Sequence, residues 1–272
     1  MLARTQHLFD DATQVTAGDS SWRGQTSDDY WAFVGPFGGA TAATILRALI
    51  DHPQRAGDPL SLTVNFCAPI AQGAFDLDVR LVRANRSTQH WSVELTQGGH
   101  EVATLATAVF AERRPSWSHQ QAEFPQATPF EQILPYPRVA ASWVKQYDIR
   151  FIEGDPNFSA TPRTAPASAF SKLWIGDRIP RKIDMLSLMS MSDAFFGRIF
   201  HARRELVPFG TVSLTTYFHA DAEDLAAEDI SRVLAVADAK IFHKSYGDQA
   251  GELWSPQGRL LATTHQIAYF KA

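Results

Sequence analysis

Cysteine is almost absent from this chain of 272 residues, because Cys67 is the only one. One cysteine excludes a disulfide within the chain and a cluster of thiolate metal ligands. Long apolar runs are also missing, since none approaches the roughly 18 to 20 residues of a membrane-spanning helix. Residues 1–11 lack the apolar core of a signal peptide. We therefore expect a cytoplasmic protein that uses no metal and no cofactor.

An excess of either charge is missing as well. The chain has 25 Lys and Arg against 29 Asp and Glu, which gives a formal net charge of −4. This balance does not favour a nucleic-acid or anionic-membrane partner. With 45% hydrophobic residues, the composition is typical of a soluble globular protein with one large domain or two ordinary ones.

What the sequence does contain is a long internal repeat. Ser61–Phe66 reads Ser-Leu-Thr-Val-Asn-Phe, and Ser213–Phe218 reads Ser-Leu-Thr-Thr-Tyr-Phe, an offset of 213 − 61 = 152 residues. A second match pairs Ala103 with Ala262, an offset of 262 − 103 = 159. The second half should then carry about seven extra residues, which we place around residues 222–230. The pattern indicates a tandem duplication.

Hydrophobic periodicity predicts the same order of elements in each half. In the first half we expect a largely enclosed helix over 40–50 after short strands within 5–34, followed by strands over 60–66, 74–84, 91–97 and 101–111. In the second half we expect strands over 142–152 and 169–175, a helix over 185–200, and strands over 211–219, 233–242, 251–254 and 260–270. This order favours an α+β fold in which an antiparallel sheet wraps a central helix twice. The predicted repeats are 1–111 and 139–272, joined by a proline-rich connection over 112–138.

Four short segments resemble the acyl-CoA thioesterase II family, whose fold is a double hotdog. They are Phe33-Val-Gly-Pro-Phe-Gly-Gly-Ala-Thr-Ala-Ala, Ser192-Asp193, the segment from Thr211 to His219, and Thr264-His265-Gln266. The resemblance covers roughly residues 20–270. It implies hydrolysis of an acyl-CoA to a free acid and coenzyme A, and a homodimer.

By position, the resemblance implies that Asp193, Thr211 and Gln266 are the catalytic residues. Thioester hydrolysis needs a positioned water, a proton acceptor and hydrogen-bond donors, which a carboxylate, a hydroxyl and an amide can supply without a metal. The family's Asp-His pair after the catalytic Thr is Ser213-Leu214 here, which leaves the substrate preference open.

The duplication predicts that only the second copy carries this chemistry. At the offset of 152, Asp193 corresponds to Thr41 and Thr211 to Pro59. At the offset of 159, Gln266 corresponds to Thr107.

Simpler structural interpretations stand beside these roles. Asp193 could cap a helix, although the apolar run 185–191 before it would place it inside one. Thr211 could be an ordinary strand threonine, and Gln266 a buried amide that needs partners. Gly38 and Gly39 are predicted to bind substrate at a helix N-terminus. The alternative is that close packing of the turn and the helix requires these glycines.

Two further sequence features bear on function. Basic residues between 178 and 204 could meet the phosphates of coenzyme A, but a solvated face explains them more simply; they are Arg178, Arg181, Lys182, Arg198, Arg203 and Arg204. His219 and His265 have no metal-ligand spacing, and no Gly-x-Ser-x-Gly motif is present. Two rival functions stay open, a hydratase or dehydratase on acyl thioesters and a non-catalytic acyl-binding protein.

Overall fold

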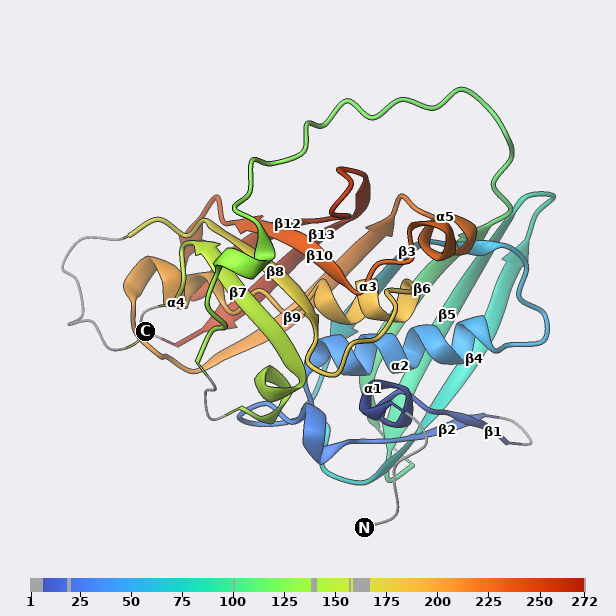
Figure 1. Ribbon diagram of the computed structural model, residues 1–272. Helices are drawn as coiled ribbons and strands as arrows, with labels where there is room; N and C mark the ends of the chain where they lie inside the picture. Colours follow the sequence, from blue (N-terminus) through green and yellow to red (C-terminus); the bar gives the residue numbers. More distant parts are fainter. Residues whose placement is uncertain are drawn as a thin grey trace, which may run out of the picture.

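One long antiparallel sheet forms the protein, with its helices gathered on one side (Figure 1). This computed structural model describes residues 7–18, 21–99, 101–137, 141–156, 158 and 167–271. Within these residues the sheet has 13 strands in the order β1-β2-β4-β5-β6-β3-β9-β13-β12-β10-β8-β7, with β11 paired to β12. The order reads the same from both ends about the β3–β9 pair, so each repeat supplies half of the sheet. The predicted α+β double hotdog is confirmed.

The first repeat contributes one central helix and six strands. Its elements are α1 (Leu8–Ala12), β1 (Thr16–Ala17), β2 (Trp22–Gln25), η1 (Asp28–Tyr30), α2 (Gly38–Ile50), β3 (Asp58–Phe66), β4 (Ala74–Ala84), β5 (Thr88–Gln97) and β6 (Glu101–Ala111). The predicted helix and four long strands of this half are therefore present. The short strands predicted over 5–34 are only partly correct, because α1 and η1 are helical.

The second repeat has the same strand order but more, shorter helices. After η2 (Phe130–Gln132) in the connection, its elements are η3 (Ser142–Gln146), β7 (Tyr147–Glu153), β8 (Ser171–Asp177), α3 (Met185–Met191), α4 (Arg198–Arg203), β9 (Phe209–Phe218), α5 (Ala222–Glu228), β10 (Arg232–Asp238), β11 (Phe242–His243), β12 (Tyr246–Trp254) and β13 (Leu260–Phe270). Buried side chains of both repeats form one continuous hydrophobic core around α2 and α3.

Small residues let α2 pack tightly inside this core. Ala42, Ala43 and Ala48 are fully buried. Gly39 approaches α3 so closely that an added Cβ would lie 2.3 Å from the backbone oxygen of Ser190. Only glycine fits this contact, which brings the beginning of α2 against the end of α3.

The single helix predicted over 185–200 is wrong. Helix α3 ends at Met191 with Ser192 as its C-cap, and α4 begins only at Arg198. Between them Phe196 has a left-handed φ of 59°. The backbone oxygens of Phe195 and Phe196 accept hydrogen bonds from the Arg198 guanidinium, so this side chain takes the place of helical N–H donors.

Three predicted strands also have wrong bounds. The strand predicted over 251–254 begins five residues earlier, because β12 already pairs with β13 at Tyr246. Residues 142–146 form a 3₁₀ turn before β7, and within it Trp143 stacks on Phe37 with ring centroids 4.4 Å apart. Strand β10 ends at Asp238, whose carboxylate accepts the backbone N–H of Ala239 and begins a turn.

The predicted insertion lies where we expected it. The segment between β3 and β4 spans residues 67–73, and the segment between β9 and β10 spans residues 219–231. The second is longer by 13 − 7 = 6 residues, close to the predicted seven, and α5 occupies it. A capping box between Asp221 and Asp224 begins this helix.

Matching bulges interrupt the first strand after each central helix. In β3, Pro59 and Ser61 pair with consecutive residues of β6, so Leu60 bulges. In β9, Thr211 and Ser213 pair with consecutive residues of β13, so Val212 bulges. The bulges are 212 − 60 = 152 residues apart, which is the offset of the repeat. Each bulge reverses the alternation of faces along its strand.

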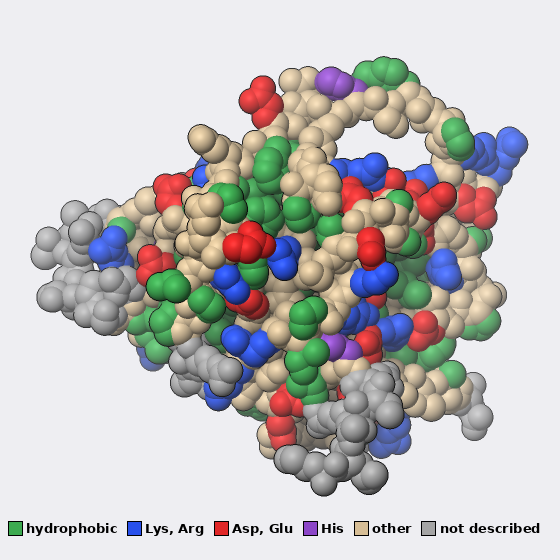
Figure 2. All heavy atoms as spheres, in the orientation of Figure 1, with side chains coloured by type: hydrophobic (Ala, Val, Ile, Leu, Met, Phe, Trp, Pro, Cys, Tyr) green, Lys and Arg blue, Asp and Glu red, His purple; other side chains and the backbone are tan. Residues whose placement is uncertain are grey.

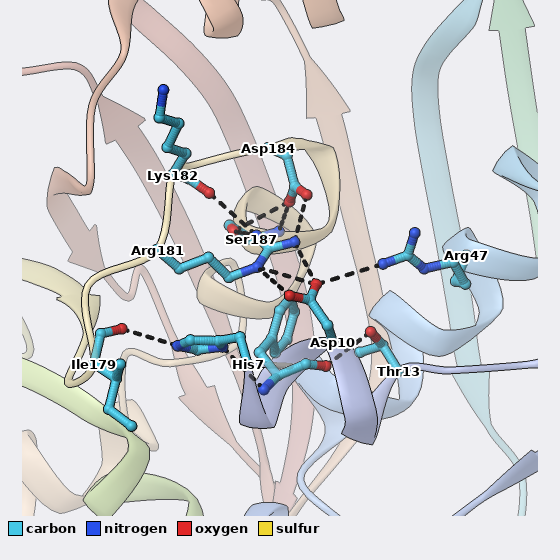
Figure 3. Close-up of polar contacts among 10 residues, drawn as sticks. His7, Asp10, Thr13, Arg47, Ile179, Arg181, Lys182, Asp184 and Ser187 are labelled. Atoms are coloured by element: carbon cyan, nitrogen blue, oxygen red, sulfur yellow. Dashed lines mark hydrogen bonds and ion pairs between the residues drawn. The ribbon is translucent and has the colours of Figure 1, made fainter. Parts of the chain in front are cut away.

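An ion-pair cluster fixes α1 to both repeats (Figure 3). Asp10 of α1 accepts hydrogen bonds from Arg181, with Nη2 at 2.7 Å from Oδ1, and lies 3.7 Å from Arg47 of α2. Arg181 also bonds Asp184, the N-cap of α3, at 2.7 Å. Arg181 is only 13% exposed, so its charge is largely compensated by these two carboxylates.

The predicted connection over 112–138 contains no strand among its described residues, and η2 is its one helical turn there. Part of it arches away from the body and leaves an opening beneath (Figure 2). Acidic and basic side chains are mixed over the face shown in Figure 2. Among the described residues no helix is long and apolar enough to cross a membrane.

Candidate active site

Asp193 lies in the turn after α3, and its carboxylate reaches the N-terminus of α2. It accepts a hydrogen bond from the backbone N–H of Gly39. An added Cβ on Gly38 would lie 2.7 Å from Asp193 Oδ2. The expectation that Asp193 is inside a helix is therefore wrong, because the carboxylate serves the first turn of a different helix. Phe37, the N-cap of α2, makes no side-chain capping bond, so Asp193 fills that role.

Gln266 on β13 faces the same point from the sheet. Its side chain is buried, and Nε2 donates to Asp193 Oδ1 at 2.9 Å and to the backbone oxygen of Ser192 at 3.2 Å. Both amide hydrogens are used, which fixes the orientation of the side chain. A purely structural amide could bond to any buried acceptor. Gln266 instead bonds to the carboxylate of Asp193 and fixes its position.

Thr211 reaches Gln266 because of the bulge at Val212. Leu214 and Thr216 face the core, and strict alternation would turn Val212 inward and Thr211 outward. The bulge exposes Val212 and turns Thr211 toward β13. Thr211 Oγ1 lies 3.5 Å from Gln266 Oε1. The structure thus links the three predicted residues in the order Thr211, Gln266, Asp193.

Burial raises the pKa of Asp193 from an ordinary value of 3.8 to about 7. The hydrogen bonds from Gly39 and Gln266 act in the opposite direction, because they favour the charged carboxylate. A carboxylate with a pKa near neutrality can both take a proton from water and return it. The arrangement is therefore suited to general acid–base chemistry.

The corresponding positions of the first copy lack these groups, with one correction to the predicted correspondence. Leu214 is the equivalent of Leu62, and their partners on the next strand are Gln266 and Ala108. Gln266 therefore corresponds to Ala108 at an offset of 266 − 108 = 158, and not to Thr107. Thr107 is exposed and on the wrong face of its strand, whereas Ala108 is buried.

Gly38 and Gly39 are both required for close packing, which was the structural alternative at this position. Gly39 approaches Ser190, and Gly38 approaches Asp193 and also Phe66, whose Cζ would be 3.2 Å from an added Cβ. Their predicted contact with substrate stays a prediction.

Sequence reasoning missed one buried polar residue beside Gln266 and misplaced another. Gln249 is opposite Gln266 in the β12–β13 pair and is 5% exposed. Arg198 is 2% exposed, so its predicted place on a solvated face is wrong. Neither could be placed without the strand register and the break between α3 and α4.

The sequence matches two family models over most of its length. Residues 27–111 match the acyl-CoA thioesterase N-terminal domain, and residues 112–270 match the acyl-CoA thioesterase C-terminal domain. The chain belongs to the acyl-CoA thioesterase family. No curated protein sequence matches it.

Solved structures agree with the fold. A conserved protein of unknown function with a hot dog fold from Alicyclobacillus acidocaldarius is 41% identical, with a TM-score of 0.92 over 98% of this chain and 99% of that one. An acyl-CoA thioesterase II from Mycobacterium marinum is 19% identical, with a TM-score of 0.74 over 97% of this chain and 98% of that one. The predicted resemblance is confirmed at the level of family and fold.

Proposed function

We propose that this protein is an acyl-CoA thioesterase that hydrolyses its substrate by direct attack of water. The observation that carries the proposal is the 2.9 Å hydrogen bond between Gln266 and Asp193 at the N-terminus of α2. It joins a proton acceptor to an oriented amide in a chain of this family. Thr211 is the third catalytic residue, and it holds the Oε1 side of the Gln266 amide.

In the proposed reaction, the carboxylate of Asp193 accepts a proton from water while the water oxygen bonds to the thioester carbonyl carbon. The resulting tetrahedral intermediate breaks its carbon–sulfur bond. The proton on Asp193 then passes to the departing sulfur, which leaves as the thiol of coenzyme A. Water thus supplies the oxygen of the free acid and the hydrogen of the thiol, and no cofactor is consumed.

Charge that develops on the thioester oxygen needs a donor at the moment of attack. Gly38 begins α2, where the helix dipole favours negative charge. We assign the predicted substrate contact of Gly38 and Gly39 to this end of the helix. The absence of a side chain at Gly38 leaves the approach to Asp193 open.

The rival functions would require different groups beside Asp193. A hydratase or dehydratase of this fold would place a histidine with the acid. Among the described residues, the hydrogen bonds to the Asp193 carboxylate come from the Gln266 amide and the Gly39 backbone, which favours hydrolysis. A non-catalytic acyl-binding protein would need neither the raised pKa nor the amide on the carboxylate.

Release of free thiol from a panel of acyl-CoA substrates tests the proposal. The wild-type protein should release coenzyme A from at least one of them, and Asp193→Asn should release it about 10²- to 10⁴-fold more slowly. No release from any substrate would favour the non-catalytic alternative, and undiminished release by the variant would remove Asp193 from the mechanism. We further propose a cytoplasmic homodimer on the family resemblance; sedimentation at several concentrations tests the dimer.

A further inference from the structure

A small crevice opens beside Gln266, on the side of β12. It is lined by Arg198, Ile199, Phe209, Phe242, Gln249 and Gln266, among others. Its walls are mostly apolar, with a few polar groups that converge on it. Because Gln266 borders both the crevice and Asp193, a group in the crevice lies next to the proposed reaction.

Gln249 presents an unused donor to this crevice. It is directly opposite Gln266 on neighbouring antiparallel strands, so the two side chains share the inner face of the sheet. Although Gln249 is 5% exposed, its Nε2 has no hydrogen-bond partner within the described part of the chain. Buried donors without partners are rare because they cost stability, and this one calls for an acceptor.

Arg198 supplies a second unused donor. Its terminal nitrogens donate to Ala169, Ser171, Phe196 and His201, at 3.0, 2.7, 3.2 and 2.9 Å. Its Nε has no partner in the described ranges, although the residue is almost fully buried.

The charges around the crevice favour a neutral acceptor over an anion. Asp238 is the charged group that acts on Arg198, so its negative charge offsets that of the guanidinium. Asp248, which alternates with Gln249 along β12, lies near the exposed His265 instead, and its carboxylate accepts the backbone N–H groups of Lys240 and Ile241. A carboxylate entering here would add a second negative charge near Arg198, besides that of Asp238, whereas a hydroxyl or keto oxygen would meet the two unused donors.

We propose that Gln249 and Arg198, which both line the crevice and each have an unused donor, form a specificity site for a neutral oxygen on the acyl group, close to the thioester. The inference rests on the proposed thioesterase function and names the substrate class: short acyl groups that carry a hydroxyl or keto oxygen near the carbonyl. In the free protein the crevice has room for about one water molecule in the place of that oxygen. An acyl group without the oxygen displaces the water and leaves both donors unsatisfied.

A matched pair of substrates tests this site. Butyryl-CoA and 3-hydroxybutyryl-CoA differ by one hydroxyl, and the ratio of their kcat/KM values reports its recognition. We expect the wild-type protein to favour 3-hydroxybutyryl-CoA by about tenfold or more, and Gln249→Met, which keeps the length of the side chain without its donor, to bring the ratio close to one.

Thr264→Val is the matched control. Thr264 is buried on β13, two residues from Gln266, and its hydroxyl also has no partner among the described residues, but it does not line the crevice. The control should keep the wild-type ratio, since a change in packing alone affects both substrates equally.

The outcomes separate this inference from the function on which it rests. Equal kcat/KM values for the two substrates in the wild-type protein, or an unchanged ratio in Gln249→Met, would overturn the specificity site while thioesterase activity stands. Absence of turnover on every thioester would overturn both. Thermal melts of each variant show that a lost preference is not a loss of the fold.

Discussion

Thr63 and Thr215 face each other across the β3–β9 pair, with their Oγ1 atoms 3.0 Å apart. They are 215 − 63 = 152 residues apart, which is the offset at which the two halves of the sequence match. Equivalent residues of an antiparallel pair can meet in this way only where a local two-fold axis passes between them. The axis of the duplication therefore crosses the sheet at these two threonines, and the three proposed catalytic residues lie off it, in the second copy.

The first prediction concerns the proton acceptor. Asp193→Asn should lower kcat by about 10²- to 10⁴-fold, the usual contribution of a general base, with little change in KM. Asp78→Asn is the control, because Asp78 is exposed on β4. Steady-state kinetics of both variants check this, and equal kinetics in the two would contradict it.

The second prediction is a pH profile. Because burial raises the pKa of Asp193 to about 7 and the charged form is the base, kcat/KM should rise with pH and level off above about pH 7. The free energy of unfolding should instead fall as the pH rises. The charged form costs more in the folded state, so wild type should lose stability relative to Asp193→Asn as the pH rises from about 4 to 7. Unfolding by urea at pH 5 and pH 8 measures this difference.

The third prediction separates Gln266 from a merely structural amide. Gln266→Leu removes the 2.9 Å hydrogen bond that favours the charged carboxylate. The pKa of Asp193 should rise, which moves the ascending limb of the pH profile to higher pH and lowers kcat at neutral pH by about 10-fold or more. If kcat fell but the ascending limb of the pH profile stayed at the same pH, Gln266 would not act through Asp193.

The fourth prediction uses three glycines with different surroundings. Gly38→Ala places a Cβ 2.7 Å from Asp193 Oδ2 and should abolish activity while the fold persists, since side-chain atoms can shift. Gly39→Ala meets the Ser190 backbone at 2.3 Å and should cost stability, by roughly 1 to 3 kcal/mol. Gly210→Ala, with nothing within 4 Å, should do neither although it adjoins Thr211. Thermal melts and activity of the three variants test the order.

The fifth prediction concerns the cluster that fixes α1. Arg181→Met leaves Asp10 and Asp184 without their shared cation and should cost about 3 kcal/mol of unfolding free energy. Lys182→Met is the neighbouring control. Lys182 is 80% exposed and pairs with an exposed Asp229, so its loss should cost well under 1 kcal/mol. Similar melting temperatures for both variants would mean that the cluster stabilises little.

The sheet and the enclosed helix could be predicted because hydrophobic periodicity depends only on residues close together in the sequence. The two offsets of the repeat then gave the place of the insertion. The break after Met191 was not predictable, since a buried Arg198 that binds backbone oxygens looks, in sequence, like one more helical residue. The bulges at Leu60 and Val212 were equally hidden, and without them the face on which Thr211 lies cannot be assigned. Asp193, Thr211 and Gln266 came from family resemblance; the register of β12 against β13 was needed to find Gln249.

The palindromic order of the sheet has a genetic consequence. If two identical single-repeat chains formed this sheet, one codon change would alter both halves, on either side of the two-fold axis at Thr63 and Thr215. Here the two halves are written separately, so one copy can carry the proposed catalytic residues while the other has Thr41, Pro59 and Ala108 in their places, and the strands of both still pair. The first copy can therefore change at these positions without changing the proposed catalytic residues of the second.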